Sequence, residues 1–273
     1  MALPVALQVY SVRDEMAKDF AGTLKKVGEM GYDGVEFAGL GSHSASEVRK
    51  MLDDAGLKGV SAHVPYEAME ADVDKVISDY KTLGCKYIAI PWLDLKRAPG
   101  GEDFESMIDP ILQIGKAAKA AGLQLLYHNH DFEFRKIGDA YGLDVLYDSV
   151  PAEFLGTEID TCWVKVSKLD PAAYVRKYKG RAPIVHLKDF VMGDNVTGNL
   201  YELIGDDNTD TNTGSKGFEF KPLGQGVQNI PEILEASLYA GAQWVVVEQD
   251  MSNDIPPLEA VKQSREYLKT LGW

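Results

Sequence analysis

The sequence has few cysteines, fewer basic than acidic residues, and no long uninterrupted hydrophobic stretch. Two cysteines, Cys85 and Cys162, are too few for the disulfide framework of a small secreted protein. Lysine and arginine number 28 against 42 aspartates and glutamates, and the net charge of −14 disfavours nucleic-acid phosphates and anionic lipid. No apolar run reaches the roughly 20 residues of a membrane-spanning helix. We therefore expect a cytoplasmic protein that binds a small molecule, with neither a nucleic acid nor a membrane as partner.

One unit recurs along the chain: a short apolar run followed by an amphipathic helical pattern, which in most repeats ends at a glycine. Continuous apolar runs of this length fit strands buried on both faces of a parallel sheet. Eight occur, at Val5–Val9, Gly34–Phe37, Gly59–Ala62, Tyr87–Ile90, Leu123–Tyr127, Phe154–Ile159, Pro183–Leu187 and Trp244–Val247. Helical spacing predicts helices at Phe20–Met30, Ser46–Ala55, Val73–Leu83, Phe104–Ala121, Gly142–Ser149, Pro171–Tyr178, Pro231–Ala240 and Leu258–Leu271.

Eight strands alternating with eight helices fit either an open doubly wound sheet or a closed barrel. The regular repeat, without a glycine-rich phosphate-binding turn after the first strand, favours a single closed (β/α)8 TIM barrel over residues 1–273. Met192–Lys221 interrupts the repeat and is rich in Gly, Asn, Asp and Thr. We expect a flexible inserted loop there, with its tip at Asn208–Gly217, that covers the active site or joins copies in a homo-oligomer.

The carboxyl ends of the predicted strands collect histidines and carboxylates, and catalytic residues of TIM barrels come from these ends. A single polar residue at a strand end is as consistent with a packed or hydrogen-bonded side chain as with a catalytic one. Several carboxylates buried around one mouth are costly unless a cation compensates them, and a mixed Glu/Asp/His set suits Mn²⁺, Co²⁺, Zn²⁺ or Mg²⁺. The set comprises His63, His128, His130, His186, Glu36, Asp131, Glu133, Glu158, Asp160, Asp189, Glu248 and Asp250.

Period-two alternation narrows the expected metal ligands. If Asp160, His186 and Glu248 point into the mouth, they come from three neighbouring strands and can converge on one ion. A fourth ligand is then expected from the preceding strand, within Tyr127–Glu133.

At these residues the chain resembles the xylose isomerase-like TIM-barrel superfamily, in its sugar phosphate isomerase/epimerase branch. The resemblance implies one divalent metal ion, Mn²⁺ in the first place, held by Glu, Asp, His and Glu. Asp160, His186 and Glu248 match this set, and we expect Glu133 as the fourth ligand, with His128 as the alternative. Trp163 stands where many epimerases have a histidine. The matching segments run in order through nearly the whole chain: Gly31–Phe37, Tyr127–Phe134, Glu158–Thr161, His186–Asp189, Pro222–Gly226 and Val247–Gln249.

The resemblance implies isomerisation or epimerisation of a small sugar or polyol by proton abstraction next to a carbonyl. We expect a nearby dication to lower the pKa of Lys188. We also expect Gly224 and Gly226 to let the backbone approach the substrate. The expected acid–base residues are Glu133, Glu248, His130 and Lys188. The expected substrate contacts are Glu36, His63, Trp92, His128 and Trp163.

Two alternatives to an isomerase remain open. A dehydratase or lyase acting on a keto-inositol or 3-keto glycoside would use the same metal and enolate, but would expel a group from the β-carbon. A barrel that binds a ligand without catalysis is the other alternative.

Overall fold

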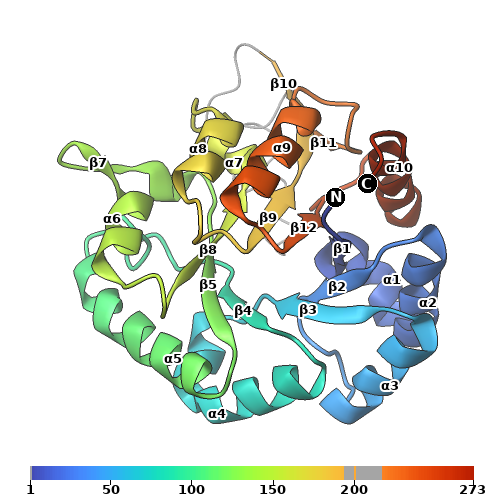
Figure 1. The fold of residues 1–273 in the computed structure, drawn as a ribbon, viewed down its shortest axis with the longest axis horizontal. Helices are drawn as coiled ribbons and strands as arrows, with labels where there is room; N and C mark the ends of the chain where they lie inside the picture. The colour runs from blue at the N-terminus through green and yellow to red at the C-terminus, as the bar shows by residue number, and fades with distance from the viewer. Residues whose placement is uncertain (1, 194–199, 201–216) are drawn as a thin grey trace.

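The computed structural model describes residues 2–193, 200 and 217–273 and has eight parallel strands at its centre (Figure 1). The order around the barrel is β3-β2-β1-β12-β9-β8-β5-β4. At the seam the amide of Val64 donates to the carbonyl of Ala89 at 2.9 Å, so the ring is nearly closed. The predicted TIM barrel is confirmed. Its strands are β1 (Val5–Gln8), β2 (Gly34–Phe37), β3 (Lys58–Ala62), β4 (Tyr87–Ile90), β5 (Gln124–His128), β8 (Gly156–Asp160), β9 (Ile184–Leu187) and β12 (Trp244–Val247).

Helices surround the strands and alternate with them along the chain (Figure 1). Ser44 and Glu47 form a reciprocal capping box at the start of α3, and Gly56 ends that helix with φ 68°. No helix within the described residues is long and apolar enough to cross a membrane. The α-helices are α1 (Arg13–Lys18), α2 (Phe20–Met30), α3 (Ala45–Ala55), α4 (Tyr66–Thr82), α5 (Ile108–Ala120), α6 (Gly142–Ser149), α7 (Thr161–Val166), α8 (Pro171–Lys177), α9 (Ile230–Ala240) and α10 (Pro257–Thr270). Short 3₁₀ turns are η1 (Val9–Val12), η2 (Phe104–Met107) and η3 (Phe132–Phe134).

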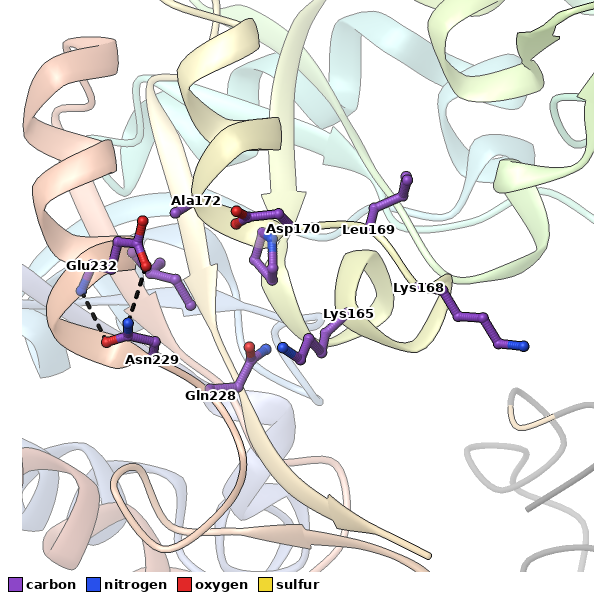
Figure 2. A pocket seen from close by; sticks show the side chains of 10 residues that line it. Lys165, Lys168, Leu169, Asp170, Ala172, Gln228, Asn229 and Glu232 are labelled. Atoms are coloured by element: carbon purple, nitrogen blue, oxygen red, sulfur yellow. Dashed lines mark hydrogen bonds between the residues drawn. The ribbon is translucent and has the colours of Figure 1, made fainter. Parts of the chain in front are cut away.

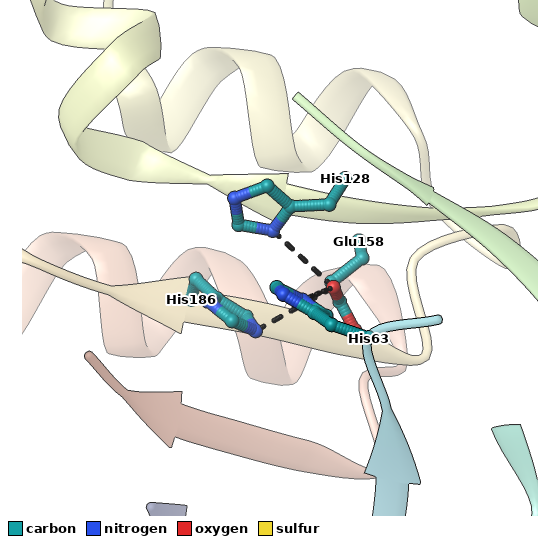
Figure 3. A group of neighbouring side chains, drawn as sticks. All are labelled: His63, His128, Glu158 and His186. Atoms are coloured by element: carbon teal, nitrogen blue, oxygen red, sulfur yellow. Dashed lines mark hydrogen bonds and ion pairs between the residues drawn. The ribbon is translucent and has the colours of Figure 1, made fainter. Parts of the chain in front are cut away.

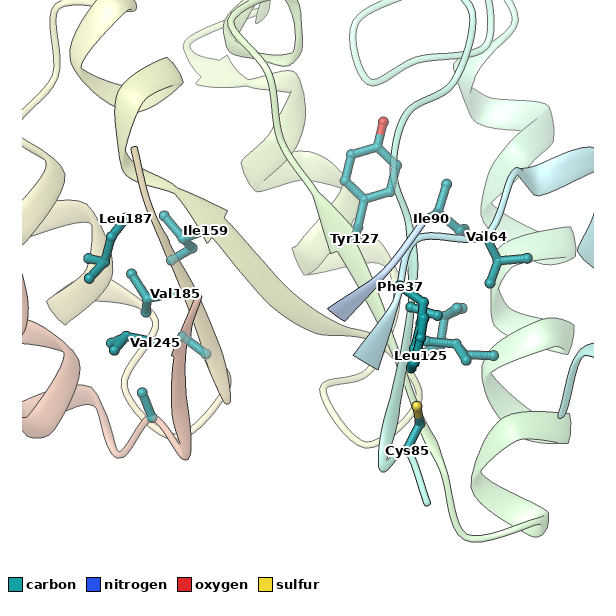
Figure 4. Close-up of a cluster of buried hydrophobic side chains, with 14 of the residues drawn as sticks. Phe37, Val64, Cys85, Ile90, Leu125, Tyr127, Ile159, Val185, Leu187 and Val245 are labelled. Atoms are coloured by element: carbon teal, nitrogen blue, oxygen red, sulfur yellow. The ribbon is translucent and has the colours of Figure 1, made fainter. Parts of the chain in front are cut away.

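Apolar side chains fill two regions: the layer between strands and helices, and the part of the barrel interior away from the carboxyl ends of the strands. Figure 4 shows part of the first layer, in which Ile159, Val185 and Val245 project from neighbouring strands. The second cluster comprises Ala6, Val60, Ala89, Leu126, Ile184 and Val246. Residues two positions apart on a strand point to the same face of the sheet. On the inner face of β9, for example, the apolar Ile184 is followed by the polar His186, which lies nearer the carboxyl end of the strand.

The segment after β9 departs from the sequence prediction at its ends. Strand β10 (Asp189–Met192) pairs antiparallel with β11 (Phe218–Lys221), so Phe218–Lys221 is a strand and the loop prediction is wrong there. Its alternating aromatic residues explain the difference, because Phe218 and Phe220 pack against the buried Trp163. A second small antiparallel pair joins β6 (Lys136–Ile137) and β7 (Ala140–Tyr141). The predicted loop tip, except Gly217, lies outside the described residues.

Candidate active site

A pocket of about 460 Å³ opens at the carboxyl ends of the strands. This volume suits a small ligand such as a monosaccharide-sized polyol. Trp92, an expected substrate contact, lines it and is 43% exposed, and Tyr10 lines it as well. The polar residues of its lining are His63, His128, His130, Lys188, Glu248 and Asp250.

Three histidines converge on one oxygen of Glu158 beside the pocket (Figure 3). Oε2 of Glu158 lies 2.6 Å from Nε2 of His63, 3.2 Å from Nδ1 of His128 and 3.6 Å from Nε2 of His186. Burial and the neighbouring Glu36 raise the pKa of Glu158 to about 7. The strand register produces this convergence, since His128 on β5 pairs with Glu158 on β8.

Glu36 joins this group from the opposite side of the barrel. Its Oε1 lies 2.8 Å from Nε2 of His186 and 3.2 Å from Nε2 of His63, and it accepts a 2.8 Å hydrogen bond from the side-chain amide Nε2 of Gln8. Burial opposes the charge of Glu36, but His186 and His63 hold its pKa at about 2. Glu36, expected as a substrate contact, is thus fully buried among side chains.

Lys188 lies at the centre of a second charged group. Its Nζ is 2.9 Å from a carboxylate oxygen of each of Asp160, Glu248 and Asp250. Burial alone would favour the neutral amine, but these carboxylates raise the pKa of Lys188 well above its ordinary value. The expected lowering concerns a site that holds a dication; among these three anions alone the pKa of the ammonium is raised.

The donor atoms of the pocket form two overlapping groups that could each hold a metal ion. One comprises His63, His128, Glu158 and His186, and the other His128, Asp160, His186 and Glu248, with ligand atoms in each group within 4.8 Å of one another. Oε1 of Glu158 and Nε2 of His186 are among the atoms of the described residues that are buried without an aligned hydrogen bond. Such atoms, in a set of imidazoles and carboxylates, fit a divalent transition-metal ion.

Glu133, the expected fourth ligand, lies outside both groups. Its carboxylate accepts hydrogen bonds from the hydroxyl of Tyr127 at 3.1 Å and from the backbone amide of His130 at 2.8 Å. Burial raises the pKa of Glu133 to about 8. The side chain therefore holds the loop that carries His130, and the alternative ligand, His128, belongs to both groups.

His130 lines the pocket and is backed by aromatic side chains. Its ring stacks on Phe132 with centroids 5.5 Å apart, and Trp163 lies 5.6 Å away. Burial and the charge of Lys188 lower the pKa of His130 well below its ordinary value, so the imidazole is neutral near pH 7. Trp163, expected against the substrate, is instead fully buried and does not line the pocket.

Asp189 organises the loop that carries the two glycines. Its carboxylate accepts hydrogen bonds from the amides of Gly224, Gly226 and Gln228 at 3.0 Å, and from its neighbour Phe190 at 2.9 Å. The amides of Gly224 and Gly226 therefore bind a side chain of the protein, so their expected role at the substrate is not what the structure shows. A Cβ at Gly226 would lie 2.1 Å from Oδ1 of Asp189, which explains the glycine.

Another hollow, of about 440 Å³, lies between the end of α7 and the start of α9 (Figure 2). Its lining includes Lys165, Asp170 and Gln228. Asn229 and Glu232 bond each other there, and Asp170 caps α8. Asp170, Asn229 and Glu232 thus serve helix starts, and no histidine is among the described residues that line the hollow. The barrel mouth is therefore the better candidate for catalysis.

Sequence reasoning gave no role to three residues at the mouth. Glu158 and Asp250 were visible as strand-end carboxylates, and their alternation with Asp160 and Glu248 indicated a shared face. Gln8, the last residue of β1, was missed altogether. Its signal was a polar residue ending the first apolar run, in register with Glu36.

The fold and the histidine–carboxylate cluster define a TIM barrel with a candidate metal centre at its mouth. The family profile described as xylose isomerase-like TIM barrel matches residues 24–271, and the chain belongs to that family, as the resemblance predicted.

Comparisons with individual proteins agree with this family. The chain is 23% identical over 277 residues to an inosose dehydratase from Geobacillus kaustophilus, covering 91% of this chain and 86% of the relative. A sugar phosphate isomerase/epimerase structure from Parabacteroides distasonis superposes with a TM-score of 0.78 at 24% identity, covering 98% of each chain. The IOLI protein, whose structure holds a zinc atom, superposes with a TM-score of 0.72 at 14% identity, again covering 98% of each chain.

Proposed function

We propose that the chain is a divalent-metal-dependent lyase that removes a β-oxygen substituent from a cyclic keto-polyol or keto-sugar. The observation that carries this proposal is the pairing of unlike groups at the pocket. His130 offers a neutral imidazole and Lys188 a stable ammonium. A two-glutamate epimerase would need two equivalent carboxylate bases. The carboxylates of the described lining are Glu248 and Asp250, and both are paired with Lys188.

His130 is the proposed base. Its imidazole takes the proton from the carbon next to the ketone, and the C–H electron pair becomes the C=C bond of an enolate. When the carbonyl re-forms, the bond to the β-oxygen breaks, and His130 returns its proton to that oxygen. With a β-hydroxyl the products are an enone and water, so atoms and charge balance without a further reactant.

Lys188 and the metal ligands have complementary roles in this proposal. The ammonium of Lys188 lines the pocket, and its three N–H groups hold Asp160, Glu248 and Asp250 in place beside the substrate. His128, His186 and the neighbouring carboxylates would hold a divalent ion, which would supply Lewis acidity for the substrate oxygens. Trp92 and Tyr10 provide apolar faces for the ring of the substrate.

The inosose dehydratase relative supports elimination as the reaction, because a keto-inositol has both the carbonyl and the β-hydroxyl that this chemistry requires. Epimerisation is the second candidate. It is favoured by Glu248, a carboxylate at the same pocket as His130 that could return the proton to the other face of the carbon. Both reactions begin with the same proton abstraction.

Enone absorbance from a keto-inositol, measured with Mn²⁺-loaded protein, tests the proposal. We expect turnover with Mn²⁺, loss of turnover in a chelator, and a fall of about 100-fold or more for His130→Gln. His43→Gln is the matched control, because His43 lies in the loop after β2 and does not line the pocket. Full activity in His130→Gln, or no enone from keto-inositols and 3-keto glycosides alike, would contradict the proposal.

A further inference from the structure

The two candidate metal groups share two histidines but use opposite ring nitrogens. His128 presents Nδ1 to Glu158 and Nε2 to Asp160. His186 presents Nε2 to Glu36 and Glu158, and Nδ1 to Glu248. A neutral imidazole has one lone pair for a metal and one N–H to donate. One ion therefore occupies one group or the other, and the second nitrogen of each ring faces a carboxylate.

The deeper group, defined here as Glu36, His63, His128, Glu158 and His186, has the closer donors. The separations between neighbouring nitrogen and oxygen atoms run from 2.6 to 3.6 Å, close enough for these side chains to reach one ion at about 2.1 Å. Nε2 of His186 lies 2.8 Å from Glu36 without hydrogen-bond alignment, and Oε1 of Glu158 has no hydrogen bond in the part of the chain described. Oε2 of Glu158 is hydrogen-bonded to His63 and His128, so the group offers an ion the unpaired atoms Nε2 of His186 and Oε1 of Glu158, together with imidazoles that already face a shared carboxylate.

The outer group contains a competing cation. Nζ of Lys188 lies 2.9 Å from both Asp160 and Glu248, two of its four ligands. An ammonium in that position repels a dication and already neutralises part of the carboxylate charge. Asp160 is further engaged because its Oδ1 accepts the amide of Cys162 at the start of α7. No lysine contacts the deeper group among the described ion pairs.

We infer that the ion of the proposed lyase is held by the deeper group, which includes Glu36 from β2 and His63 from the loop after β3, and that Lys188 occupies the place of an ion in the outer group. The inference rests on the proposed function. Three imidazoles with two carboxylates suit Co²⁺, Mn²⁺ or Zn²⁺ over Mg²⁺. In this arrangement Nδ1 of His186 donates to Glu248 at 2.9 Å, and Nε2 of His128 faces Asp160. Carboxylates usually bind the free ring nitrogen of a metal-bound histidine in this way.

The test uses the full chain loaded with Co²⁺ as the probe. X-ray absorption at the cobalt edge counts imidazole ligands, and we expect three rather than two. Calorimetric titration with Co²⁺ then compares two charge-removing isosteres, Glu36→Gln in the deeper group and Asp160→Asn in the outer one, with His63→Gln as a further variant. We expect Glu36→Gln and His63→Gln to weaken Co²⁺ binding more than about 100-fold, and Asp160→Asn by about 10-fold.

The outcomes separate this inference from the proposed function. Two imidazoles at cobalt, or loss of Co²⁺ in Asp160→Asn but not in His63→Gln, overturns the deeper site and leaves the lyase proposal standing. A wild-type protein that binds no Co²⁺ overturns both. The absorption measurement needs only the wild type, so it decides the question even where a variant fails to fold.

Discussion

Replacing Lys188 with methionine removes one buried ammonium while keeping the length of the side chain. Three carboxylates, on Asp160, Glu248 and Asp250, then lose a cation that lies 2.9 Å from each. Breaking a buried ion pair by deleting one partner costs about 3–5 kcal/mol. We expect Lys188→Met to lower the free energy of unfolding by that amount at pH 7, measured by urea denaturation with a chelator present.

The loss should depend on pH in a defined direction. Burial already raises the pKa values of Asp160 and Asp250, and loss of the ammonium raises them further, so these two carboxyls favour folding while protonated and lose that contribution as pH rises. The destabilisation should therefore be smaller at pH 5 than at pH 8. Lys177→Met is the matched control, because Lys177 pairs with Asp144 at 2.6 Å but is half-exposed, and should cost about 0–1 kcal/mol. Equal losses in the two variants, or a loss independent of pH, would refute the reasoning.

Three further predictions follow from single side chains. Glu133→Gln should leave metal content unchanged and raise the free energy of unfolding at pH 9 by about 1–3 kcal/mol. The folded-state pKa of Glu133 is about 8, so the wild-type protein loses stability as pH rises from about 4 through 8, and the glutamine does not. Metal analysis and denaturation at pH 5 and 9 check this. Gly226→Ala should cost about 1–3 kcal/mol in a thermal melt, because its Cβ would meet Asp189, whereas Gly193→Ala should change little. The kcat/KM for enone formation should be flat from about pH 6.5 to 8, because the lowered pKa of His130 leaves its base form in place; a rise across that range would show another base.

The barrel was predictable because apolar runs and glycine-ended helices repeat along the chain. Such runs report burial on both faces, so β1, β4 and β12 lie where Val5–Val9, Tyr87–Ile90 and Trp244–Val247 were predicted. Strand β11 was not predicted, since its aromatic residues pack on Trp163, a contact between segments about 55 residues apart. The pattern of residues in one segment does not show which distant residue that segment will pack against.

The site was predictable in composition but only partly in arrangement. Strand alternation indicated which residues face the mouth, and His128, His186 and Glu248 do so. The position of Glu133 depends on the turn η3, which directs its carboxylate to the amide of His130. The environment of Lys188 depended on register among β8, β9 and β12, which the sequence does not encode locally.

The most direct test of the lyase proposal is proton NMR of a keto-inositol incubated in D₂O with Mn²⁺-loaded protein, after removal of the metal for measurement. The account predicts an enone product that has lost the β-hydroxyl, with water released in step with substrate consumption. Recovery of the starting ketone or its epimer, with deuterium next to the carbonyl and the β-oxygen retained, would contradict it.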